Sequence, residues 1–181
     1  LPSSGSDFHA FMYSGGVMSD LGTLGGSYSS ANDINDNGQI VGQSSLVSGT
    51  LFPVRAFLYS DGLMHDLGTL DGYSSVATGI NNMGQVVGET NGIPKRVFLY
   101  FQAITTDLNT LLDSSATGWT LATARAINDN GWIVGSAYTP DQVEHAVLLI
   151  PEPQIPVFFL FSLLTMSRTS WAWRRNMGCS P

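Results

Sequence analysis

Charged residues, cysteines and long apolar runs are all scarce in this sequence of 181 residues. Charged side chains make up 12% of the chain, which argues against long surface helices held by ion pairs. The single cysteine, Cys179, leaves no possible intramolecular disulfide, so a disulfide-stapled scaffold is excluded while the redox compartment stays open. No uninterrupted apolar run reaches the ~20 residues that a helix across a bilayer needs.

Glycine and small polar residues are abundant instead. The chain holds 20 glycines, and Ser, Thr and Asn fill much of the rest, which favours an all-β protein with many turns. The net charge is -7 overall, and 13 of the 14 acidic residues lie before Ile150 together with only four of the seven basic ones. A body this acidic should repel nucleic acid and anionic lipid, so we expect no nucleic-acid partner.

One phrase occurs three times. Residues 32–42 read Asn-Asp-Ile-Asn-Asp-Asn-Gly-Gln-Ile-Val-Gly, and related phrases occupy residues 79–88 and 126–135. The Ile-Asn pairs begin at positions 34, 80 and 127, so the period is that of one supersecondary unit repeated in series. Asn followed closely by Gly predicts a hairpin turn, because both residues tolerate a positive φ. The residues expected to shape the turns are Asn35, Gly38, Gly42, Asn81, Gly84, Gly88, Asn128, Gly131 and Gly135.

Each repeat predicts short strands joined by hairpins. First strands are expected at residues 9–13, 55–59 and 96–100, with a fourth copy at 145–149. Alternating apolar and polar residues predict returning strands at 17–21 and 63–67, and third and fourth strands follow at 31–35, 77–81 and 39–43. A connection rich in small residues, such as Gly22 to Gly26, joins the two hairpins of a repeat. The expected organisation is repeat 1 at 1–54, repeat 2 at 55–95, a variant repeat 3 at 96–144, a final strand at 145–150 and a tail at 151–181.

Repeated four-stranded antiparallel units of this length are typical of β-propeller blades. Three such units are too few to close a ring, so we expect an open arc of blades or part of a larger ring. A β-trefoil and a β-prism are the alternatives, since both also contain three four-stranded units.

Several phrases together resemble the HAF family of extracellular repeats. They are His9-Ala10-Phe11, the run from Asp20 to Gly26, and Ile-Asn-x-x-Gly-Gln-x-Val-Gly, and the match spans residues 9–149. In the third unit, residues 107–112 replace the Gly-Thr-Leu-Gly phrase and residues 113–119 form an insertion, which resembles the closing repeat of such proteins. The resemblance implies further repeats before Leu1 and assigns no established activity.

The tail resembles a PEP-CTERM sorting signal. It contains Pro151-Glu152-Pro153, an apolar run from Ile155 to Met166, and the basic pair Arg174 and Arg175. The resemblance implies export to the cell surface or matrix of a Gram-negative bacterium and processing by an exosortase. Because the apolar run has about a dozen residues where a span needs ~20, it predicts transient membrane contact rather than stable spanning. A short apolar C-terminal helix is the alternative interpretation.

Two patterns raise the possibility of chemistry. Asp33, Asn35 and Asn37 fit the first half of a calcium loop, but Ser44 stands where the distal carboxylate belongs, so a hairpin turn is the preferred interpretation and no metal is expected. Asp20, Asp66 and Asp107 occupy one equivalent position per repeat. Paired carboxylates could act as acid and base in a glycosidase, yet equivalent positions lie on separate blades, so bonds to local backbone amides are the preferred interpretation.

Other side chains follow the repeat rather than a catalytic pattern. His9 and His145 share the strand-opening position with Arg55 and Arg96, no nucleophile motif or phosphate-binding loop is present, and no cofactor is expected. The Phe and Tyr residues that recur in the first strands could line a carbohydrate-binding face. Their fixed place in the strand makes packing in the core the preferred interpretation. The tryptophans of the third repeat, Trp119 and Trp132, are the aromatics most expected at the surface.

The leading hypothesis is therefore a non-enzymatic extracellular repeat protein that binds polysaccharide or an envelope protein. The rival hypothesis is a propeller-type glycan-acting enzyme whose site lies partly in missing repeats.

Overall fold

The structure is a computed structural model that describes residues 7–47, 53–70, 72–151 and 173–175. These residues form β-strands and two short 3₁₀ helices. The strands are β1 (Phe11–Ser14), β2 (Val17–Asp20), β3 (Ser29–Ile34), β4 (Ile40–Ser45), β5 (Val54–Ser60), β6 (Leu63–Asp66), β7 (Ser75–Ile80), β8 (Val86–Thr90), β9 (Val97–Phe101), β10 (Ile104–Asp107), β11 (Thr120–Ile127), β12 (Ile133–Tyr138), β13 (Glu144–Pro151) and β14 (Trp173–Arg175).

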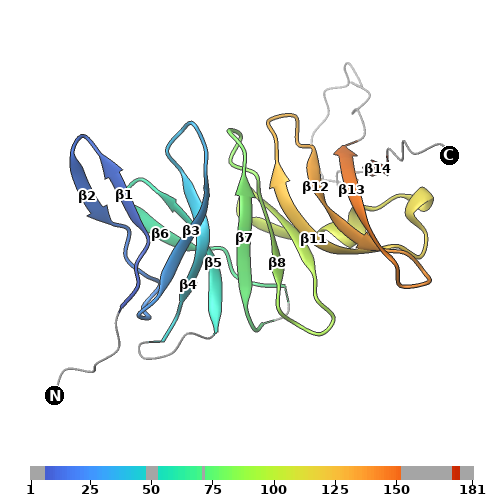
Figure 1. The fold of residues 1–181 in the computed structure, drawn as a ribbon, viewed down its shortest axis with the longest axis horizontal. Coiled ribbons are helices and arrows are strands. Elements are labelled where there is room, and N and C mark those ends of the chain that lie inside the picture. The colour runs from blue at the N-terminus through green and yellow to red at the C-terminus, as the bar shows by residue number, and fades with distance from the viewer. Residues whose placement is uncertain (1–6, 48–52, 71, 152–172, 176–181) are drawn as a thin grey trace, which may run out of the picture.

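The strands make one two-stranded and three four-stranded sheets. β1 pairs with β2, and the larger sheets have the orders β3-β4-β5-β6, β7-β8-β9-β10 and β11-β12-β13-β14, with every pairing antiparallel. Figure 1 shows the sheets following one another along the long axis, from the β1–β2 hairpin at one end to β11–β14 at the other. The prediction of an all-β chain with antiparallel sheets is confirmed.

The sheets are offset from the sequence repeats by one hairpin. β3 and β4 belong to repeat 1, whereas β5 and β6, in the same sheet, belong to repeat 2. The expectation that the four strands of one repeat form one sheet is therefore wrong. The small-residue connection leads from one sheet to the next, since β2 and β3 lie in different sheets and so do β6 and β7. The leucines just before it, Leu21 and Leu67, are buried in the apolar clusters between sheets.

Three apolar clusters hold the row of sheets together. Phe57 and Ile40 pack against the β1–β2 hairpin and the residues beside it. Val41 and Phe98 meet between the first and second four-stranded sheets. Val87 packs between the second and third four-stranded sheets. Fully burying one side chain of this size contributes roughly 1.5–3 kcal/mol. Each four-stranded sheet therefore buries apolar side chains against its neighbours in the row.

The same β-bulge recurs in all three phrases. The register shifts between Ala31 and Asp33 in β3, and at the equivalent places in β7 and β11. The glycine opposite each bulge has no room for a side chain: a Cβ at Gly42 would lie 1.9 Å from the Ser30 carbonyl oxygen, and one at Gly88 would lie 2.2 Å from that of Val76. The last glycine of the phrase is thus required by close backbone approach.

The third repeat contains the only helical turns among the described residues. The 3₁₀ helices η1 (Leu108–Leu111) and η2 (Ser114–Ala116) fall in the variant phrase and in the insertion after it. Asp107 and Asp113 cap them by accepting from the backbone N–H groups two residues later. Leu108 is fully buried, so η1 continues the core contact made by the leucines of the earlier connections.

The described tail residues extend the last sheet. Pro151 ends β13 and pairs with Trp173, and Arg174 and Arg175 in β14 pair with the two residues before Pro151. Glu152, Pro153 and the expected apolar helix over 155–166 lie outside the described residues. Within the described part of the chain, no helix has the length and hydrophobicity that crossing a membrane requires.

Candidate functional site

The repeated turn is built around one asparagine side chain. In repeat 1 the Oδ1 atom of Asn35 accepts from the backbone N–H groups of Asn37 and Gln39, at 3.1 and 3.0 Å. Its Nδ2 atom donates to the Gln39 Oε1 atom at 2.7 Å. Gly38 completes the turn with a φ of 73°, a conformation open to glycine without strain. The predicted hairpin turn at 35–38 is confirmed.

The second repeat copies this arrangement. Asn81 Oδ1 accepts from the N–H groups of Met83 and Gln85, and its Nδ2 atom donates to Gln85 Oε1 at 2.6 Å. In the third repeat Asn128 Oδ1 again accepts two turn N–H groups, while Trp132 replaces the glutamine. Gly84 and Gly131 have φ values of 76° and 77°, so all three turns share one backbone conformation.

The same asparagines also connect neighbouring repeats. Asn35 Nδ2 donates to the carbonyl oxygen of Asn81 at 3.0 Å, and Asn81 Nδ2 donates to the carbonyl oxygen of Asn128 at 2.9 Å. Asn35 and Asn81 are buried, and both of their amide groups are fully hydrogen-bonded. We call this series the asparagine ladder: Asn35, Asn81 and Asn128.

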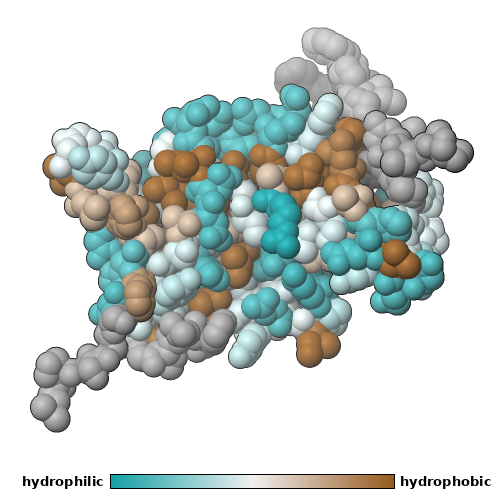
Figure 2. All heavy atoms as spheres, in the orientation of Figure 1, coloured by the Kyte–Doolittle hydropathy of each residue, from teal (hydrophilic) through white to brown (hydrophobic). Residues whose placement is uncertain are grey.

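A second row of bonds runs beside the ladder. The backbone N–H of Asp36 donates to Asn82 Oδ1, and that of Asn82 donates to Asp129 Oδ1, each at 2.8 Å. Asn82 Nδ2 donates to a carboxylate oxygen on each side, on Asp36 and on Asp129. Figure 2 shows hydrophilic residues gathered along the upper edge of the molecule, where Figure 1 places the three turns.

The apparent calcium ligands are used in these contacts. Asp33 accepts from the backbone N–H of Ile34 with one oxygen and from that of Ile80, in the next repeat, with the other. Asn37 donates from Nδ2 to the Asn82 carbonyl oxygen, so its amide also points to the neighbouring turn. Within the ranges that the structure describes, no three His, Cys, Asp or Glu side chains are grouped as metal ligands.

The repeated aspartates cap the connections between sheets. Asp20 accepts from the backbone N–H of Gly22 at 2.7 Å, and Asp66 accepts from that of Gly68 at the same distance. Asp107 accepts from the N–H of Asn109 at 2.9 Å. The interpretation of these carboxylates as local backbone acceptors is confirmed.

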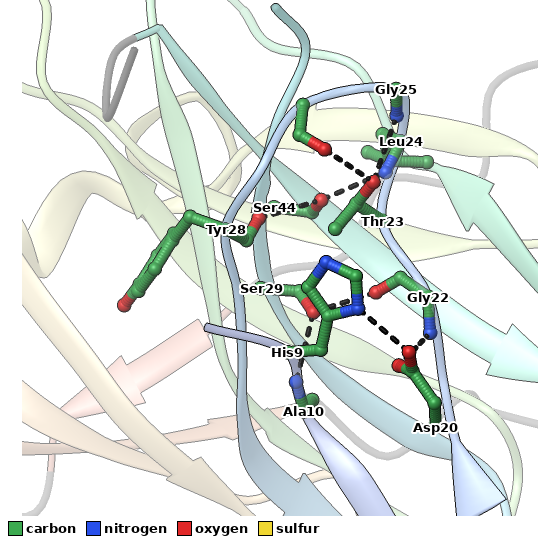
Figure 3. A network of polar contacts seen from close by, with 11 residues as sticks. His9, Ala10, Asp20, Gly22, Thr23, Leu24, Gly25, Tyr28, Ser29 and Ser44 are labelled. Carbon is green, nitrogen blue, oxygen red and sulfur yellow. Dashed lines mark hydrogen bonds and ion pairs between the residues drawn. The ribbon is translucent and has the colours of Figure 1, made fainter. Parts of the chain in front are cut away.

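Figure 3 shows the first of these connections in detail. Ser29 accepts from the N–H of Ala10 and donates to the carbonyl of Gly22, and Asp20 accepts from His9 Nδ1 at 2.7 Å. These bonds tie the segment before β1 and the connection after β2 to the start of β3. The hydrogen bond from His9, followed by that from the Gly22 N–H, lowers the pKa of Asp20 below its ordinary value.

The strand-opening position carries a structural contact in each repeat. His9 pairs with Asp20, Arg55 donates to the carbonyl of Tyr73, and Arg96 pairs with Asp107 at 2.9 Å. His145 lies against the ring of Trp119, with ring centroids 5.7 Å apart.

The aromatic series is divided between core and surface. Phe57 and Phe98 are fully buried, as predicted, whereas Phe11 and Tyr13 in β1 are exposed. Trp132 is partly exposed, but Trp119 packs against the last apolar cluster, so its predicted surface position is wrong. The short Asp113 to Trp119 insertion folds back on that cluster, which the sequence pattern did not indicate.

A scan against protein-family models gave no match for this chain, and neither a search of curated proteins nor one of solved structures found a similar protein.

Proposed function

We propose that this chain is a non-enzymatic extracellular repeat protein of the HAF type, whose four-stranded sheets are propeller-like blades in an open arc. A β-trefoil or β-prism arrangement is the alternative architecture. The observation that carries the proposal is that the repeated polar residues make hydrogen bonds within the repeats and between them. Asn35 and Asn81 join one turn to the next, and Asp20, Asp66 and Asp107 each accept a local backbone N–H.

This use of the carboxylates favours a scaffold over a glycan-acting enzyme. Hydrolysis of a glycosidic bond needs two carboxylates that face the same bond, one of them with a raised pKa. The equivalent aspartates of this chain belong to separate connections, and the pKa of Asp20 is lowered rather than raised. The scaffold then presents its outer surface to an extracellular polysaccharide or an envelope protein.

The tail is the basis of the proposed cellular location. Pro151, Glu152 and Pro153, the apolar run and the basic pair Arg174 and Arg175 act as a sorting signal read by an exosortase, with transient membrane contact during export. The chain is then located on the cell surface or in the extracellular matrix of a Gram-negative bacterium.

Two measurements test the proposal, one on the tail and one on the full chain. A reporter fused before residues 151–181 should be exported by a Gram-negative host that contains an exosortase, and should remain inside when Pro151 and Glu152 are both replaced by Ala. A panel of bacterial polysaccharides should show saturable binding without cleavage. Cleavage that disappears in Asp66→Asn, with folding intact, would establish the enzyme in place of the scaffold.

A further inference from the structure

A shallow polar groove lies across β11, β12 and β13, which Figure 1 shows side by side in the last sheet. Its volume is about 380 Å³, within the roughly 300–1,000 Å³ that is typical of ligand sites. The lining contains a guanidinium, a carboxylate, an imidazole and two hydroxyl groups. The residues are Thr123, Arg125, Gly135, Ser136, Glu144, His145 and Ala146. We call this feature the β11–β13 groove.

Arg125 enters the groove from the β-bulge of the third repeat. The register of β11 shifts around Arg125, as those of β3 and β7 shift around Asn32 and Thr78. Asn32 and Thr78 each donate to a backbone carbonyl oxygen of the next repeat, at 2.7 Å. Arg125 is exposed and has no hydrogen bond or ion pair with any described residue. Its guanidinium has five N–H donors, of which a single carbonyl would satisfy one, so Arg125 is suited to a ligand with several acceptors.

A pair of hydroxyl groups holds the carboxylate of the groove. Ser136 Oγ donates to Glu144 Oε1 at 2.6 Å and lies 2.9 Å from the Thr123 hydroxyl. The other carboxylate oxygen of Glu144 has no partner within the described part of the chain. Arg125 and Glu144 line the same groove without forming an ion pair with each other. A donor-only group and an acceptor-only group are therefore both available to a ligand there.

Aromatic side chains flank these polar groups. His145 lies against the ring of Trp119, with ring centroids 5.7 Å apart, and Trp119 packs on the last apolar cluster. The insertion of the third repeat thus supports one wall of the groove. Tyr138 is the cross-strand partner of Glu144 and is 37% exposed, so its ring lies on the same face as the carboxylate. An aromatic ring beside polar groups can pack against the apolar face of a ligand.

We propose that the β11–β13 groove binds an uncharged glycan. A sugar hydroxyl both donates and accepts, so neighbouring hydroxyls of one ring can accept from Arg125 and donate to Glu144. These two side chains carry opposite charges and the rest of the chain is acidic, which disfavours an anionic glycan. Arg125, Glu144 and His145 are exposed, so the groove is open to a polymer that continues past it. The inference rests on the proposed function, in which the chain binds polysaccharide, and adds the site and the class of glycan.

Calorimetric titration of the full chain with dextran, galactomannan and alginate tests the groove. At least one of the two neutral polymers, dextran and galactomannan, should bind saturably. Arg125→Ala should raise the dissociation constant roughly tenfold, because charge-assisted hydrogen bonds to the glycan are lost. Glu144→Gln should raise it about threefold, since the amide keeps one acceptor oxygen and loses the charge.

Arg55→Ala is the matched control. It removes the same charge from the strand-opening position of the second repeat, which lies outside the groove. The affinity of this variant should equal that of the unchanged chain. Because Arg125 bonds to no other residue in the described ranges, Arg125→Ala should also leave the thermal unfolding midpoint unchanged, which separates loss of binding from loss of folding.

The outcomes separate the groove from the proposed function. A neutral polymer that binds Arg125→Ala and Glu144→Gln as tightly as the unchanged chain overturns the groove and leaves the proposed function standing. Binding of alginate alone overturns the uncharged class of ligand. Absence of binding to all three polymers overturns the inference and also removes polysaccharide from the proposed function, which then depends on an envelope protein as the partner.

Discussion

The side chain of Asn81 makes hydrogen bonds in two directions at once. Its oxygen organises the turn of its own repeat, and its nitrogen reaches the backbone of the next repeat while also bonding Gln85. The residue is 2% exposed, so water cannot replace these partners. The contribution of Asn81 to the free energy of unfolding therefore includes the cost of leaving buried N–H and C=O groups unpaired when its side chain is removed.

Replacing Asn81 by Ala should lower the free energy of unfolding by roughly 2–4 kcal/mol, because buried groups on two repeats lose their partners. Asn128 is the matched control, since it is exposed and shapes its own turn without a described following repeat. Asn128→Ala should cost about 1 kcal/mol. Urea denaturation measures both, and equal losses for the two variants would contradict the ladder.

Asp20 gives a prediction about pH. Its folded-state pKa is lowered, first by the bond from His9 and then by that from the Gly22 N–H, so its contribution to stability is present above the unfolded pKa and is lost as the pH falls through the folded pKa. In a carbon-13 NMR titration, Asp20 should titrate below an ordinary aspartate. His9→Ala should raise the midpoint without removing the whole shift, since Gly22 still donates. An unchanged midpoint would show that the His9 contact does not exist in solution.

At the scale of elements, the hairpin of each phrase depends on the bulge and on the glycine opposite it. A Cβ at Gly88 would lie 2.2 Å from the Val76 carbonyl oxygen and 2.4 Å from the ring of Phe98, which is buried. Neither neighbour can move without disturbing β7 or the core between sheets.

Gly88→Ala should therefore destabilise the fold by more than about 3 kcal/mol. Gly62 provides a control, because it has a φ of 80° with open space around it. Gly62→Ala should cost about 1 kcal/mol, the strain of a positive φ alone. Thermal unfolding compares the two variants, and similar midpoints would mean that the bulge relaxes easily.

The sequence predicted the elements well and their grouping poorly. Turns at Asn35 and Asn81 follow from local rules, since Asn and Gly favour the required backbone angles. β5 and β6 belong to the sheet of β3 and β4 because β5 pairs with β4, and no local sequence pattern indicates that pairing. The bonds from Asn35 to Asn81 were missed for the same reason, although identical spacing of the two asparagines was a usable signal.

At the scale of the whole molecule, the sheets form a row in which each interface repeats the one before it. Stability in such a row is close to a sum of repeat and neighbour contributions. Ladder bonds join residues 46 and then 47 positions apart, which matches the sequence period. The repeated phrase therefore has two structural roles, a turn within a sheet and a joint between sheets.

The measurement that tests this account most directly is hydrogen exchange of the asparagine side-chain amides in the unchanged protein, followed by NMR. The account predicts slow exchange for Asn35 and Asn81, whose Nδ2 groups are buried and bonded to the next repeat, and fast exchange for the exposed Asn128. Fast exchange at all three would contradict the ladder, because the turns would then be no more than local hairpin turns.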